Sequence, residues 1–162
     1  MDYGEASANG GAKADFGLVS LRMIRLFAIL RRAGILAQRR LFGLSETEWR
    51  IMTQLGEAAP LSLNGLADAM LQDRGQLSRA VKSMVERGLL TRQRKPGGPE
   101  IEIDLSARGR TIYDKMVEWV HERDRVLTEG MPQEDVATVW RVLGEMMERA
   151  QGMVDEEQRL DG

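Results

Sequence analysis

The chain has 162 residues, of which 43% are hydrophobic and 30% charged, with 23 Lys and Arg against 25 Asp and Glu. This length suits one domain or one domain with an appendage, and the composition excludes a fibrous or wholly disordered protein. With no cysteine and one histidine, His121, the chain lacks the side chains for a disulfide framework or an ordinary zinc or iron site. It also lacks a P-loop and a Gly-x-Ser-x-Gly motif, so we expect no enzyme activity, no metal and no cofactor.

The charge is unevenly distributed along the chain. Six arginines and no acid occur from Arg22 to Arg40, the segment Gln72–Lys95 has a net charge of +5, and Asp114–Asp161 has a net charge of −7. A positive middle in a chain with a net charge of −2 predicts one surface that faces a polyanion.

Residues 1–15 are rich in Gly, Ala, Ser and Asn, and we expect them to form a flexible tail. They show no secretory signal, and no apolar stretch is long enough to span a membrane. A cytoplasmic location without membrane association is the expectation.

The first strong helical pattern runs from about Phe16 to Leu41, and Gly43 is expected to end it. We interpret segment 16–42 as a packing or dimerisation helix with a solvated arginine face. A membrane-surface helix is the alternative, but arginines on several faces leave no clean apolar side.

Two shorter helices are predicted next. Ser45 and Glu48 form a capping box that opens a helix ending near Gly56. Ser62 is expected to cap a helix over Leu63–Met70, followed by a turn over Leu71–Asp73.

A second Asp-x-x-Gln capping box, Asp73 with Gln76, opens a helix over Arg74–Arg87 that stops at Gly88. Four apolar residues at helical spacing are expected to face the core, namely Leu77, Val81, Met84 and Val85. The opposite face carries no acid and consists of residues that can hydrogen-bond base edges or phosphates, namely Gln76, Ser78, Arg79, Lys82 and Ser83.

After Gly88 the pattern changes to short extended segments. Leu89–Arg92 and the alternating Glu100–Leu105 flank the Pro/Gly-rich turn Lys95–Pro99, which predicts a β-hairpin. Ser106 is expected to cap a helix to about Thr128, and a last helix begins at Gln133 with near-heptad apolar spacing.

This order of elements predicts a mainly α fold with a small β-hairpin wing, in which a winged helix-turn-helix lobe over residues 44–105 is followed by C-terminal helices over residues 106–158. The expected DNA contacts are Arg74, Gln76, Ser78, Arg79, Lys82, Ser83, Arg92, Arg94 and Lys95. Two alternatives stay open: a merely solvated helix face, and a winged helix that binds protein and no DNA.

Leu63–Met70 (LNGLADAM) and Asp73–Leu90 (DRGQLSRAVKSMVERGLL) resemble the MarR family of bacterial transcription regulators. The segments LSETEWRIM from Leu44 and LSARG from Leu105 are similar to that family's motifs at the same points of the fold. The resemblance implies a homodimer whose terminal helices interlock, while two lobes grip a pseudo-palindromic operator in double-stranded DNA. Repression is the family's majority behaviour.

The resemblance also implies a small-ligand pocket between the dimer helices and the lobe, for an aromatic acid or a thioester. The candidate lining residues are Arg22, Arg25, Trp49, Arg50, Met52, Tyr113 and Met116. Ordinary core packing is the alternative for Trp49 and the methionines. One departure from the family concerns the wing, where Gly97–Glu100 replaces the usual arginine-containing tip and leaves open whether Arg94 and Lys95 take over its contact.

Overall fold

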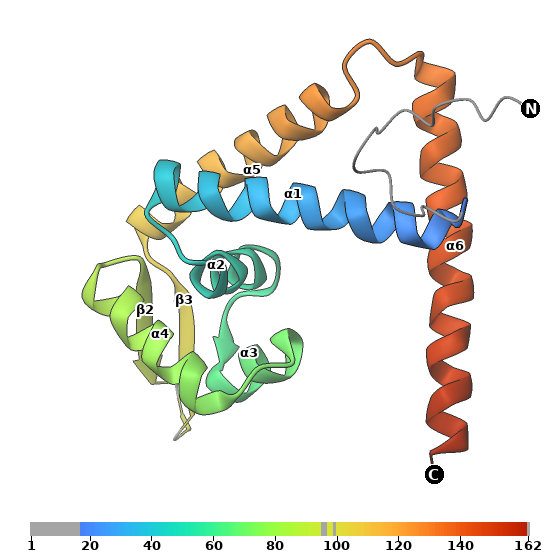
Figure 1. The fold of residues 1–162 in the computed structure, drawn as a ribbon. Coiled ribbons are helices and arrows are strands. Elements are labelled where there is room, and N and C mark those ends of the chain that lie inside the picture. The colour runs from blue at the N-terminus through green and yellow to red at the C-terminus, as the bar shows by residue number, and fades with distance from the viewer. Residues whose placement is uncertain (1–16, 95–96, 99, 162) are drawn as a thin grey trace, which may run out of the picture. The chain divides into compact units, whose positions relative to one another are not determined.

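The computed structural model describes residues 17–94, 97–98 and 100–161 (Figure 1). The tail predicted over residues 1–15 and the wing residue Lys95 lie outside the described residues. The chain divides into two compact units, residues 1–113 and 114–162, with the boundary inside one helix. The elements are α1 (Val19–Phe42), α2 (Glu46–Ala58), β1 (Leu61–Ser62), α3 (Leu63–Met70), α4 (Arg74–Glu86), β2 (Leu90–Arg94), β3 (Ile101–Leu105), α5 (Ala107–Leu127) and α6 (Gln133–Leu160).

The three strands form one antiparallel sheet in the order β1-β3-β2. Leu90 pairs with Leu105 and Arg94 with Ile101, which confirms the predicted hairpin. The helices given above, together with this small sheet, confirm the mainly α fold class. Strand β1 was not predicted, and it adds to the free edge of β3 through Leu61 opposite Ile103.

The helices begin and end close to the predicted residues. The capping box at the start of α2 is complete, because Glu48 N–H donates to Ser45 Oγ and Ser45 N–H donates to the Glu48 carboxylate. At the start of α4 only half of the expected box is present among the described hydrogen bonds, in which Gln76 N–H donates to Asp73 Oδ1 at 2.9 Å. Helix α2 continues to Ala58, past the end expected at Gly56, and stops before Pro60, which disfavours helical backbone in the residue preceding it.

The core of the lobe is formed by the apolar faces of α2, α3 and α4 and by the sheet. On α4, Leu77, Val81 and Met84 are buried as predicted, whereas Val85 is half-buried. The other buried side chains in residues 44–105 are Leu44, Ile51, Met52, Leu55, Leu66, Met70, Leu89, Leu90, Ile103 and Leu105.

The start of α5 is hydrogen-bonded to the lobe through Ser106. Ser106 Oγ accepts a hydrogen bond from Gly109 N–H at 2.9 Å, as expected for a helix cap, and donates to the Gly88 carbonyl at 2.6 Å. A Cβ added at Gly109 would meet the Leu89 carbonyl, and one added at Gly56 would meet the ring of Tyr113. Both glycines therefore allow an approach that no larger residue permits.

Two long helices bury almost nothing within this single chain. In α1 only Gly34 is buried, and in α6 no residue is buried. Side chains left in solvent include Phe27 on α1, which is 65% exposed, and Trp140 on α6, which is 71% exposed.

Candidate nucleic-acid interface

The outer face of α4 is polar, cationic and open. Gln76, Ser78, Arg79 and Lys82 are exposed, while Ser83 is half-buried and lies at the edge of the face. Lys82 Nζ lies 3.9 Å from a Glu86 carboxylate oxygen, and both side chains are more than half exposed. Such a solvated pair is weak, so Lys82 is available to another anion.

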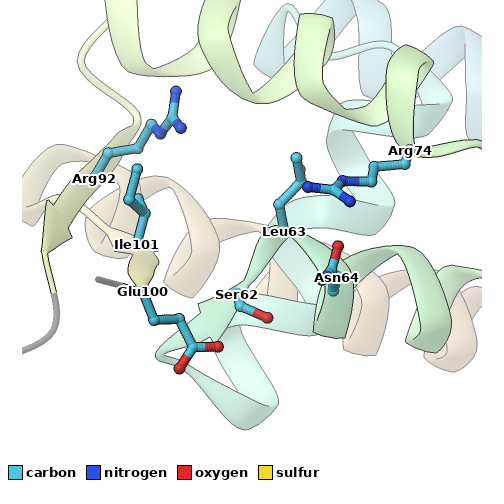
Figure 2. Close-up of a pocket in the computed structure, with 7 residues that line it drawn as sticks. All are labelled: Ser62, Leu63, Asn64, Arg74, Arg92, Glu100 and Ile101. Atoms are coloured by element: carbon cyan, nitrogen blue, oxygen red, sulfur yellow. The ribbon is translucent and has the colours of Figure 1, made fainter. Parts of the chain in front are cut away.

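A recess of about 250 Å³ lies beside this face (Figure 2). Figure 2 shows Arg74 of α4 and Arg92 of β2 on opposite sides of the recess, and Ser62 and Asn64 at the start of α3. Glu100 is an acidic member of the lining and reduces the positive potential there. The remaining lining residues are Leu63 and Ile101. The recess therefore lies between the start of α4 and strand β2 of the wing.

The wing continues the basic surface along β2. Arg92 and Arg94 are exposed and two residues apart, so they lie on the same face of the strand. They pair across the sheet with Ile103 and Ile101. The predicted third cation of the wing, Lys95, lies outside the described residues.

The structure thus brings Arg74 and Arg92 together around one recess and arranges Gln76, Ser78, Arg79 and Lys82 along one helix. Sequence reasoning missed Ser62, Asn64 and Glu100 as neighbours of the two arginines. Their proximity depends on the pairing of β1 with β3, and a two-residue strand has too few positions to show a period-two pattern.

Three of the residues predicted for a ligand pocket, Trp49, Arg50 and Tyr113, make contacts with residues of the first unit. The ring of Trp49 meets Phe42 edge-on with centroids 5.6 Å apart, and Arg50 Nη2 donates to the Met70 carbonyl at 2.6 Å. Tyr113 packs against Gly56. Met52 and Met116 are buried, and Arg22 and Arg25 are exposed on α1.

Other kinds of site were searched for in the part of the chain that the structure describes. That part contains no group of three or more His, Cys, Asp or Glu side chains placed to hold a metal ion. None of its helices has the combination of length and apolar character needed to cross a bilayer.

Comparison with known proteins agrees with this geometry. Residues 42–98 match the sequence model of the MarR family. No curated protein matches the sequence significantly.

Solved structures share the fold over most of the chain at low sequence identity. Streptococcus pneumoniae FabT in complex with DNA aligns with a TM-score of 0.73 and 15% identity, covering 86% of this chain and 99% of FabT. A mutant MarR from E. coli aligns with a TM-score of 0.70 and 17% identity, covering 80% of this chain and 96% of that one. A MarR/EmrR family transcriptional regulator from Acinetobacter sp. ADP1 aligns with a TM-score of 0.61 and 21% identity, covering 83% and 98%.

The sequence match covers α2 through β2, which include the elements that carry the exposed basic surface, and the shared fold extends to β3 and the flanking helices. Residues 42–98 are thus similar to the MarR family, and the chain shares its winged-helix fold with the solved structures named above.

Proposed function

We propose that the protein is a sequence-specific DNA-binding transcriptional regulator that acts as a homodimer. The observation that carries the proposal is the exposed face of α4, on which Gln76, Ser78, Arg79 and Lys82 stand beside the arginine-flanked recess. The similar fold of FabT, solved in complex with DNA, supports the same assignment.

The chemistry of each side chain suggests its task. In the major groove Arg79 fits the two acceptors of guanine and Gln76 the donor and acceptor of adenine, and each such pair discriminates by about 1–3 kcal/mol. Ser78 and Ser83 suit base edges or phosphates, and Lys82 suits either. Arg74 at the start of α4, with Arg92 and Arg94 on β2, suits phosphate oxygens, and contacts to phosphates set register without reading sequence.

The unburied helices support the homodimer. Contiguous apolar side chains on a soluble domain mark a surface that another molecule covers. Helices α1 and α6 both present such side chains, and a second copy has matching faces. A two-fold dimer predicts inverted half-sites about 34–36 Å apart, or one turn of DNA.

The family resemblance also supports a proposal about regulation. The dimer represses transcription, and a small aromatic acid or acyl thioester releases it from DNA. Arg22, Arg25 and Trp49 remain the candidate contacts for such a ligand. Isothermal titration of the protein with a panel of aromatic carboxylates and acyl thioesters, repeated with operator DNA bound, tests this part.

In vitro selection from a random duplex library tests DNA recognition directly. We expect inverted repeats to be enriched, with an affinity that falls steeply as salt rises. On the selected duplex, Arg79→Ala should weaken binding by about 1–3 kcal/mol and relax the base preference at one position per half-site.

The control is Arg141→Ala, which removes an arginine paired with Glu145 on α6 and carries the same charge change. No enrichment of any duplex in dilute buffer would overturn the proposal and favour the protein-binding alternative. Equal losses for Arg79→Ala and Arg141→Ala would show that the recognition surface lies elsewhere.

A further inference from the structure

Arg87 forms the C-cap of α4 and makes two strong contacts with distant parts of the chain. Its Nη1 donates to Glu48 Oε1 at 2.6 Å, and its Nη2 donates to the Gly43 carbonyl at 2.9 Å. The Glu48 side chain is only 12% exposed, so this ion pair is better shielded from water than the other surface pairs of the lobe.

Three helix ends meet at this residue. Gly43 is the C-cap of α1, and Glu48 closes the capping box of α2 through its other carboxylate oxygen. From the start of α5, Arg108 Nη1 donates to the Arg87 carbonyl at 3.1 Å. The exit of α4 is therefore tied to the end of α1 and to the beginning of α5 by side-chain hydrogen bonds.

The guanidinium of Arg87 is already engaged by protein acceptors at both terminal nitrogens. Arg87 therefore differs from the exposed Arg79 and from Lys82, whose only described partner is the solvated carboxylate of Glu86. Arg31 of α1 also forms a bidentate pair with Glu46 of α2, but this pair includes no residue of α4. Among the described ion pairs, the one between Arg87 and Glu48 is thus the link between α2 and the end of the recognition helix.

We infer that Arg87 is a positioning residue for DNA recognition, whose side chain fixes the direction of α4 relative to the end of α1 and the start of α2. The inference rests on the proposed function, in which α1 and α5 belong to the dimer and each protomer places one α4 in the major groove. Because the two recognition helices must then match two half-sites at one separation, a firmly held α4 makes the dimer discriminate between operator spacings.

The test measures affinity on the selected operator and on versions with one base pair inserted or deleted between the half-sites. One base pair changes the separation by about 3.4 Å and also rotates one half-site around the duplex. The wild-type protein should lose at least about tenfold in affinity on either version, comparable to the cost of a mismatched base pair.

Arg87→Met should weaken binding to the original operator by about tenfold. Because the substitution breaks the link that holds α4, the variant's affinity should fall only a few-fold further when the spacing between the half-sites is altered. Glu48→Gln is the sharper variant: glutamine can still serve in a capping box, so the start of α2 is preserved and mainly the partner charge of Arg87 is removed. The two changes should not add in the double variant, because they break the same link. Arg87→Lys, which keeps one ion pair but cannot bridge to Gly43, should be intermediate.

Arg125→Met is the matched control, because this arginine makes a bidentate pair with Glu122 on its own helix. It should keep the wild-type spacing preference.

Three results would overturn the inference. A variant with a lower melting temperature but the wild-type spacing preference would show a purely structural role for Arg87. A reduced salt dependence of binding with the spacing preference unchanged would show a direct phosphate contact. Failure of the wild-type protein to bind any duplex would overturn the proposed function together with this inference, and that outcome is separable from the other two.

Discussion

The lobe over residues 44–105 and the helix α6 use similar apolar patterns with opposite results. In the lobe, Leu66, Leu77 and Ile103 are buried to within 1% of complete burial. In α6, Trp140 and Met147 recur at helical spacing, yet no residue of the helix is buried within the chain. An amphipathic pattern predicts that one face of a helix is covered, but it does not show whether the same chain or another molecule covers that face.

This difference divides the molecule by the origin of its stability. The lobe draws on burial that folding of one chain completes, whereas the burial of α6 would be completed by the homodimer proposed above. Variants placed in each region separate the two contributions.

The largest effect is expected for Leu66→Ala in the core of the lobe. Leu66 has 0% exposure, and truncating such a leucine leaves a cavity that costs about 2–5 kcal/mol of unfolding free energy. Urea denaturation followed by circular dichroism measures the loss, with Leu160→Ala at the 72% exposed end of α6 as the control. Equal losses for the two variants would contradict the division between the regions.

Trp140→Ala should separate association from folding. A tryptophan buried in an interface contributes about 2 kcal/mol or more to association, so the dimer dissociation constant should rise by at least about 30-fold. Sedimentation equilibrium measures it, and Arg141→Ala serves as the neighbouring control. If the dissociation constant is unchanged, α6 does not form the interface through this face.

A smaller, stabilising effect is expected within the turn between α3 and α4. Leu71 has a φ of +49° and is 92% exposed, so it adopts a left-handed conformation without gaining burial. Leu71→Gly removes a strain of about 1 kcal/mol and should raise the melting temperature of the lobe. Calorimetry checks the shift, and Leu71→Ala, which keeps a Cβ at the strained position, should give no comparable gain.

The smallest effect concerns Glu122 in the exposed part of α5. Hydrogen bonds from Arg125 hold the pKa of the Glu122 carboxyl below its ordinary value; desolvation opposes this shift and the charge of the arginine adds to it. Because the folded-state pKa is lowered, the stabilisation is present above the ordinary glutamate pKa and is lost as the pH falls through the folded value. A carbon-13 NMR titration should show the Glu122 pKa rising in Arg125→Met, and identical titration curves would contradict the pairing.

Sequence reasoning predicted the described helices because each has a 3.6-residue apolar pattern of its own, and several also begin at a capping residue. Ser45, Ser62 and Asp73 signal helix starts locally, and Leu77 with Val81 and Met84 signals the buried face of α4. The hairpin was predictable from the short extended segment before a Pro/Gly turn and the period-two alternation of Glu100–Leu105 after it.

What escaped prediction depends on residues far apart in the chain. Strand β1 is defined by its partner β3, some forty positions later, and not by its own two residues. Arg87 was identified only as the end of a helix, since its partners Gly43 and Glu48 lie 44 and 39 positions away. No local rule connects an arginine to acceptors at such separations.

Ser62 belongs at once to β1 and to the cap of α3, because it pairs with Glu102 and accepts a hydrogen bond from Gly65 N–H at 3.0 Å. No linker residue separates the sheet from the first helix of the helix-turn-helix. The same residue therefore connects the sheet that carries the wing directly to that helix. In the proposed complex with DNA, a duplex whose shape does not suit both a groove contact and a wing contact would have to bend, so the bendability of the sequence between the two contacts would contribute to selectivity.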